Sequence, residues 1–252
     1  RQTNDGLEVL KKSATKNPEN ANVRAWLGRF FDSCGDCGSA EDQLRRALAL
    51  SPGDNRAKVW LATVLISVNR CDEAEALLRE VLRVEPERGH AQHALGVALL
   101  QKGAPHAALP VLQKGLEFLQ NDAVYLRDLG SAYHLTKNYK AACSAFEAAL
   151  VLDPGLDSAR ILKFFDSAMM CDWNSEPTAD VLADLGTRIA VSPWLALHLE
   201  DAPVRQRDRA RAWSARIGPT SKKELPAQPL IEGRRLRIGY FSSDIHNHAT
   251  LH

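Results

Sequence analysis

The sequence lacks the features that identify several common classes of protein. Lys and Arg total 32 against 31 Asp and Glu, so the basic excess of a dedicated nucleic-acid or membrane-surface binder is missing. No apolar run approaches the roughly 18 residues of a membrane span. Residues 1–5, RQTND, include neither an initiator methionine nor the apolar core of a signal peptide. We expect a trimmed or internal fragment that binds neither nucleic acid nor membrane.

Cysteine is also scarce. The five cysteines are an odd number in a long chain and do not make a disulfide framework, so we expect a reducing, cytoplasmic location. Cys34 and Cys37 are spaced as a CxxC pair. A redox pair of this kind needs a βαβ context, and a zinc site needs a second pair of ligands; the sequence supplies neither.

What the chain has instead is a repeat. Prolines stand at positions 18, 52, 86 and 154, separated by 34, 34 and 68 residues. With repeats counted from residues 21, 55, 89 and 123, position 7 is always leucine, position 8 is small, position 20 is alanine and position 24 is large and apolar. The position-8 residues are Gly28, Ala62, Gly96 and Gly130, and the position-24 residues are Leu44, Leu78, Leu112 and Phe146. This is the period of the tetratricopeptide repeat, in which each unit is a pair of helices, A and B.

The columns predict how the helices pack. Positions 4, 7, 8 and 11 form one face of helix A, and positions 20, 24 and 27 form the facing stripe of helix B. A single pair cannot bury these faces, so neighbouring pairs stack into a superhelix with a concave surface. We expect four repeats over residues 20–154, preceded over residues 1–19 by helix B of a partial repeat that carries Leu7, Leu10 and Ala14.

Position 17 explains the cysteines more simply than a metal or redox site does. It holds Cys37, Cys71, Pro105 and Tyr139 in the four repeats. A place filled by such different side chains is typical of packing in the turn between the two helices.

The period lapses after Pro154, and we expect a helical bridge over residues 155–218. It includes helices over 157–173 and 178–191 and a last helix capped by Asp201, with Ala210, Trp213 and Ile217 on its apolar side. The arginines of this helix could meet phosphate, but a solvated face is the preferred interpretation; they are Arg205, Arg207, Arg209, Arg211 and Arg216. Residues 219–233 are rich in proline and predict an extended connector.

Residues 236–241 alternate in a way that predicts a β-strand, ended by Ser242, Ser243 and Asp244. One strand cannot satisfy its own backbone groups, so residues 234–252 are predicted to begin a second domain. The expected fold class is mainly α: a tetratricopeptide superhelix, a helical bridge and the first strand of another lobe.

The order of these parts, with Cys171-Asp172-Trp173 in the bridge and LRIGYFSSDIHNHATLH at residues 236–252, resembles the protein O-linked N-acetylglucosamine transferases and their bacterial relatives, glycosyltransferase family 41. The resemblance implies a GT-B catalytic fold of two Rossmann-like lobes and inverting transfer of a sugar from UDP-N-acetylglucosamine to Ser or Thr of proteins recruited by the repeats. It implies no metal or other cofactor. Because the chain stops at His252, we expect it to be inactive alone. The alternative is an interaction scaffold without catalytic activity.

The resemblance also implies site residues. Asn247 and His248 match a pair in which the histidine lines the active site, so His248 is the predicted catalytic residue. It could accept the proton of the acceptor hydroxyl or donate a hydrogen bond to the sugar or a phosphate oxygen. Asn247 and His252 are the predicted substrate contacts. A metal site that adds Asp244 and His246 is a further alternative, although no single helix or strand would present all three histidines.

The repeats depart from that family at position 6. The animal enzymes carry there a ladder of asparagines that binds the backbone of the protein substrate, whereas this chain has Trp26, Trp60, Ala94 and Asp128. An indole cannot reproduce the paired donor and acceptor of an amide. We therefore expect Trp26 and Trp60 to pack between repeats.

Overall fold

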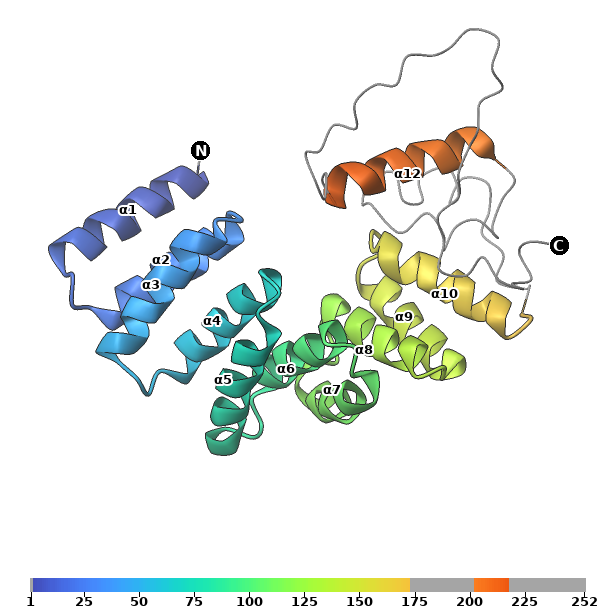
Figure 1. The fold of residues 1–252 in the computed structure, drawn as a ribbon, viewed down its shortest axis with the longest axis horizontal. Coiled ribbons are helices and arrows are strands. Elements are labelled where there is room, and N and C mark those ends of the chain that lie inside the picture. The colour runs from blue at the N-terminus through green and yellow to red at the C-terminus, as the bar shows by residue number, and fades with distance from the viewer. Residues whose placement is uncertain (1, 173–201, 218–252) are drawn as a thin grey trace, which may run out of the picture. The chain divides into compact units, whose positions relative to one another are not determined.

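The computed structural model describes residues 2–172 and 202–217, and these residues form helices and turns without a β-strand (Figure 1). The helices are α1 (Gln2–Lys16), α2 (Ala21–Ser33), α3 (Cys37–Leu50), α4 (Asn55–Ser67), α5 (Cys71–Val84), α6 (Gly89–Gln101), α7 (Pro105–Leu119), α8 (Ala123–Leu135), α9 (Tyr139–Leu152), α10 (Asp157–Met169) and α12 (Pro203–Ile217). The predicted helix over 178–191, the connector and the strand over 236–241 lie outside the described residues.

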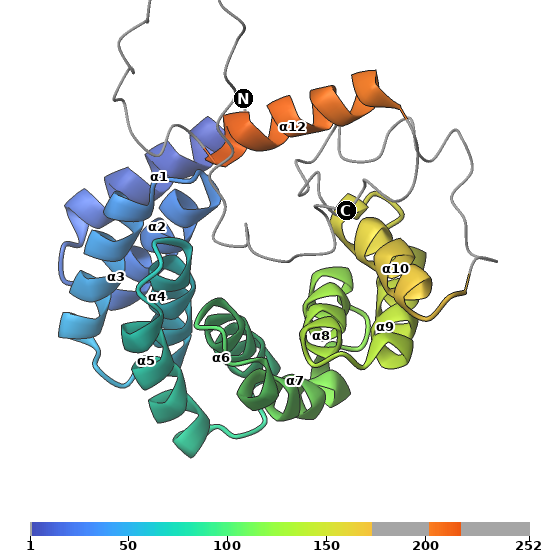
Figure 2. The ribbon, with the colours of Figure 1, turned by 45° about the vertical axis from the view of Figure 1, so that its right-hand side comes forward.

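Helices α2 to α9 form two layers. The A helices α2, α4, α6 and α8 contact one another in succession, and each packs against the B helix that follows it. Figure 2 shows α4, α6 and α8 on the inner side of the array and α5, α7 and α9 on the outer side. The predicted tetratricopeptide superhelix is confirmed, with helix A of the four repeats starting at Ala21, Asn55, Gly89 and Ala123.

Small residues at position 8 let the two helices of a repeat cross closely. A Cβ atom added at Gly96 would lie 2.4 Å from the Leu112 side chain, and one added at Gly130 would lie 2.5 Å from the Phe146 ring. Positions 20 and 24, which face this crossing from helix B, are fully buried in every repeat. The core therefore lies between the layers, where the sequence columns predicted it.

The array continues at both ends. Helix α1 packs on α2 in the place of a preceding helix B. Helix α10 begins at Asp157, one period after Ala123, and packs on α8 and α9. Its Arg160 guanidinium donates to the backbone carbonyl of Pro154, as Arg24 donates to that of Pro18 in the first repeat (2.6 Å). The segment predicted as a bridge thus opens with a helix in the place of a further helix A.

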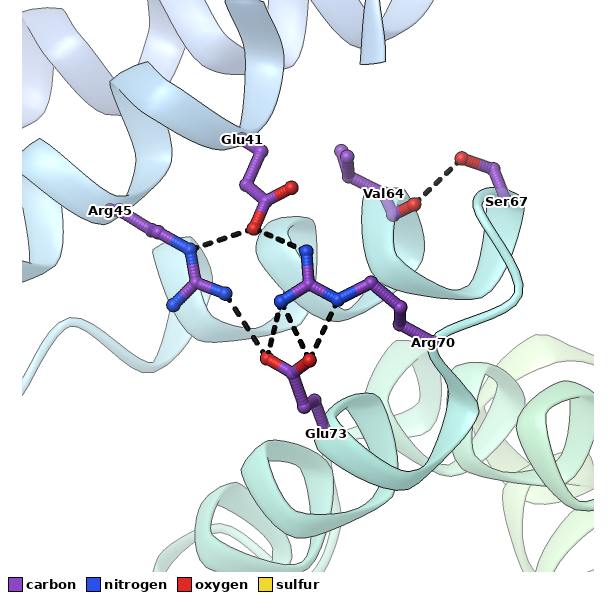
Figure 3. A network of polar contacts seen from close by, with 6 residues as sticks. All are labelled: Glu41, Arg45, Val64, Ser67, Arg70 and Glu73. Carbon is purple, nitrogen blue, oxygen red and sulfur yellow. Dashed lines mark hydrogen bonds and ion pairs between the residues drawn. The ribbon is translucent and has the colours of Figure 1, made fainter. Parts of the chain in front are cut away.

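Charged side chains also connect neighbouring repeats. Glu41 of α3 accepts hydrogen bonds from Arg45 of the same helix (2.8 Å) and from Arg70, which precedes α5 (2.7 Å). Both arginines also reach Glu73 of α5, so that two carboxylates and two guanidinium groups form one network (Figure 3). One period further on, Lys102 binds Glu75 and Asp72, each at 2.7 Å.

The prediction for the last helix was partly wrong. Arg209 of α12, assigned to a solvated face, is fully buried, whereas Ala210, assigned to the apolar side, is exposed. Trp213, also assigned to the apolar side, is half-buried. The arginines at 205, 207, 211 and 216 are exposed as expected. The assignments of Arg209 and Ala210 were wrong, because alternating arginines leave few apolar residues to mark the buried side of the helix.

Candidate functional site

The site residues predicted from the family resemblance, Asn247, His248 and His252, lie outside the described residues, as do Asp244 and His246 of the alternative metal site. The CxxC pair is described: Cys34 and Cys37 are free thiols, and the Cys37 sulfur lies 3.4 Å from Ser67 Oγ. In residues 2–172 and 202–217 no cluster of His, Cys, Asp and Glu is arranged to hold a metal ion.

The described part of the chain does contain a groove on the A-helix layer, with a volume of about 460 Å³. Helices α2, α4, α6 and α8 and the turn before α6 all contribute to it. The lining residues are Arg29, Arg56, Val59, Trp60, Thr63, Ile66, Arg88, His90, His93, Ala94, Val97 and Asp128.

Repeat geometry explains why these side chains meet. Most of them occupy positions 2, 5, 6 and 9 of their repeats, a spacing that places them on one face of a helix. Positions 7, 8 and 11 are turned toward helix B, so this second face of helix A is left open. When successive A helices stack, their open faces become one continuous surface.

An aromatic pair lies at one end of the groove, where Trp60 lines the groove and Trp26 packs against Trp60 beside it. The rings of Trp26 and Trp60 are 4.9 Å apart and tilted by 57°, so the prediction that they pack between repeats is confirmed. Trp60 also packs against the core, whereas Trp26 leaves 49% of its surface exposed. The Arg56 guanidinium lies 5.7 Å from the Trp26 ring centre and 5.2 Å from that of Trp60. This end therefore combines a large apolar surface with a positive charge.

The cations of the groove come from three elements. Arg29 of α2 binds Asp32 (2.5 Å), and Arg88, just before α6, binds Glu85 (2.5 Å). Arg56 at the start of α4 donates to Asn22 (2.5 Å) and Asp54 (3.3 Å), and its Nε is buried without a hydrogen-bond partner. The carboxylate partners of the arginines do not line the groove.

A fixed polar contact forms the other end. His93 Nε2 of α6 lies 2.8 Å from Asp128 Oδ2 of α8. The other carboxylate oxygen accepts from Arg127, at 2.9 Å from Nε and 2.7 Å from Nη2. The Asp128 charge is therefore already matched by its neighbours.

Only part of this groove was predicted from the sequence. Position 6, which supplies Trp60, Ala94 and Asp128, was singled out, whereas the lining arginines and histidines were not: Arg29, Arg56, Arg88, His90 and His93. Positions 2, 5 and 9 could have indicated the groove, because their residues vary between repeats, whereas residues at core positions 7 and 20 do not.

Comparison with known proteins agrees with the fold. Tetratricopeptide repeat models match residues 35–98 and 128–155, and the chain is a tetratricopeptide-repeat protein. No curated protein matches it. None of the matching family models covers residues 234–252, so the glycosyltransferase resemblance stays a prediction.

Solved structures with the same fold are numerous. YrrB, a TPR protein with an unusual peptide-binding site, is 24% identical and has a TM-score of 0.55, covering 76% of this chain and 97% of its own. Pseudomonas aeruginosa pilF is 20% identical with a TM-score of 0.63, covering 76% and 86%. TTC0263, a TPR protein of Thermus thermophilus, is 20% identical with a TM-score of 0.56, covering 76% and 98%. At these identities the likeness concerns the fold.

Proposed function

We propose that this chain is an interaction module whose A-helix groove binds a segment of a partner protein. The observation that carries the proposal is the groove of about 460 Å³ at the Trp26–Trp60 pair. A half-exposed tryptophan beside a concave, largely apolar surface is the kind of anchor that dominates binding energy at protein interfaces.

Two further facts support this function. The groove is built from helices whose opposite faces are fixed in the core, so its shape exists before a ligand arrives and little ordering cost is added on binding. YrrB, whose fold this chain shares, has a peptide-binding site.

In the described residues no helix is long and apolar enough to cross a membrane.

The test is selection from a phage-displayed library of random peptides on the immobilised 252-residue chain, followed by titration of the selected peptides. Trp26→Ala is expected to weaken binding by about tenfold, because a buried aromatic anchor contributes roughly 1–2 kcal/mol. Phe118→Ala is the matched control, since Phe118 is similarly exposed (46%) but lies at the end of α7, outside the groove. Selection of no peptide, or equal binding by both variants, would refute the proposal.

From the sequence resemblance we also propose that the chain is part of a cytoplasmic UDP-sugar-dependent protein glycosyltransferase, in which the repeats recruit the acceptor. The stretch LRIGYFSSDIHNHATLH supports this second function. Labelled UDP-N-acetylglucosamine and a cell lysate as acceptor would test the full-length parent beside its His248→Ala variant. We expect transfer by the parent, loss in the variant and no turnover by this chain alone. Transfer that persists in the variant would remove His248 from the site.

A further inference from the structure

We infer that the groove selects acidic segments: its occupant carries Asp or Glu next to one apolar or aromatic side chain. This inference rests on the proposed function and adds to it the chemistry of the partner. It follows from which charges face the groove, which of them are already matched, and what lies between them.

The cations of the groove are accessible to a ligand. The side chains of Arg29, Arg56 and Arg88 are 47%, 36% and 28% exposed. A guanidinium group has five N–H donors, and the bonds to Asp32 and Glu85 use one nitrogen each of Arg29 and Arg88. Each of these two arginines therefore keeps donors for a second carboxylate. Arginine is also well suited to this role because its planar fork matches the two oxygens of a carboxylate.

The anions of the groove are not similarly accessible. Asp128 is the sole carboxylate among the lining residues, and it is held by His93 and by Arg127. Its side chain is only 14% exposed. A basic ligand would meet three arginines and no free acid, and like charges would be brought together at a cost in binding energy. An acidic ligand would meet no unpaired carboxylate among the lining residues.

The surface between the charges is apolar. Val59, Trp60, Ala94 and Val97 line the groove along α4 and α6. A ligand that offered carboxylates alone would leave this surface in contact with water, whereas one apolar or aromatic side chain would cover it. The favoured segment therefore combines an apolar anchor with acidic neighbours.

The composition of the selected peptides tests the inference directly. In the library selection on the full chain, we expect enrichment of Asp and Glu beside Phe, Trp, Tyr or Leu. Synthetic versions of the selected peptides with Asn and Gln in place of Asp and Glu are expected to bind more weakly, and the affinity of the acidic versions is expected to fall as salt is added.

A pair of matched variants locates the contact. Arg29→Gln and Arg46→Gln each remove one exposed arginine that pairs with an aspartate on its own helix, but only Arg29 lines the groove. We expect Arg29→Gln to weaken the acidic peptides by about fivefold, which corresponds to the upper range for an exposed charge pair. Arg46→Gln should leave their affinity unchanged.

The outcomes separate the inference from the proposed function. Enrichment of neutral or basic peptides whose binding depends on Trp26 would overturn the acidic preference and leave the groove as a binding site. Equal affinity of acidic peptides for the Arg29→Gln and Arg46→Gln chains would also overturn it, because the acidic contact would then lie elsewhere. If no peptide is selected, the proposed function itself fails, and the inference with it.

Discussion

The residue at position 8 decides how closely the two helices of a repeat approach each other. Gly28, Gly96 and Gly130 each face the position-24 side chain of the same repeat, and an added Cβ atom would come within 2.6 Å of it. Leu112, which faces Gly96, is fully buried and cannot swing into solvent. The structure therefore leaves no room for a side chain at Gly96.

The close contact between Gly96 and Leu112 leads to a stability prediction. Gly96→Ala should lower the free energy of unfolding by about 1–3 kcal/mol, because overpacking forces the Leu112 side chain or the two helices to shift. Gly53→Ala is the control: nothing lies within 4 Å of a Cβ atom at that turn position. Urea unfolding of the three proteins would measure the difference. Equal stability of Gly96→Ala and the wild type would disprove the close crossing.

Single residues also show why the groove was harder to predict than the core. A core column such as position 20 is alanine in all four repeats, because the same two helices meet there each time. The groove needs different side chains in successive repeats to match one ligand, so none of its positions keeps one residue type in all four repeats. Arg56 and His90 share position 2, but Arg29 stands at position 9 and Arg88 lies before its helix. The periodicity of the sequence therefore predicts how the helices stack but does not predict which residues line the groove.

At the scale of helices, capping and charge determine how repeats are joined. The first residues of α3 and α9 are capped by Asp36 and Asn138, which accept from the backbone N–H groups of Ser39 and Ala141. At the same repeat position α5 is preceded by Arg70, which makes no cap bond. Arg70 instead binds Glu41 and Glu73 (Figure 3). In these three repeats the residue before helix B thus either caps that helix or binds the preceding repeat.

This network should make stability depend on pH. Hydrogen bonds from Arg45 and Arg70 hold the pKa of Glu41 below its ordinary value of 4.5. A carboxyl whose pKa is lower in the folded state contributes stability above its unfolded pKa and loses it as the pH falls through the folded pKa. We expect Glu41→Gln to cost about 0.5–1 kcal/mol at neutral pH, and we expect this cost to shrink as the pH falls through the folded pKa of Glu41 and the wild-type carboxyl becomes protonated.

Urea unfolding of both proteins over a series of pH values from neutral to acid would measure this difference. Asp42→Asn is the control on the same helix, because its ion pair, with Arg46 (3.0 Å), stays within α3. A cost of Glu41→Gln that persists unchanged at acid pH would show that the glutamate acts through packing and not through its charge.

Helix α10 shows the limit of column matching. Its sequence has Lys163 and Phe164 where the repeats have leucine and a small residue, so the columns end at Pro154. The helix nevertheless begins one period after α8 and packs as a helix A does. Its contact with the array uses other groups: Oδ1 of the buried Asp166 lies 2.6 Å from Nδ1 of His134 in α8. Such a tertiary pair leaves no periodic trace in a sequence.

At the scale of the whole molecule, contacts are local. Helices of the array pack on the next helix or the next but one, and no extensive contact joins distant repeats among α1 to α10. Stability in such a stack is close to a sum of repeat and nearest-neighbour contributions. The repeats could be predicted from the sequence for the same reason, since each obeys rules that are set by its immediate neighbours. The groove spans several of these units, and ligand binding would couple them.

Because the contacts are local, a destabilising substitution in one repeat is expected to loosen only the helices near it. Gly28→Ala would bring a Cβ atom within 2.6 Å of Leu44 and 3.1 Å of the Ala40 carbonyl oxygen, which loosens the first complete repeat. Hydrogen exchange followed by mass spectrometry should then rise in α1 to α3 and stay unchanged in α8 to α10, because the opening of one end need not unfold the other. A uniform rise over α1 to α10 would instead mean that the array unfolds as one cooperative unit. In that case the groove could not open at the Trp26 end without loss of the His93–Asp128 contact at the other.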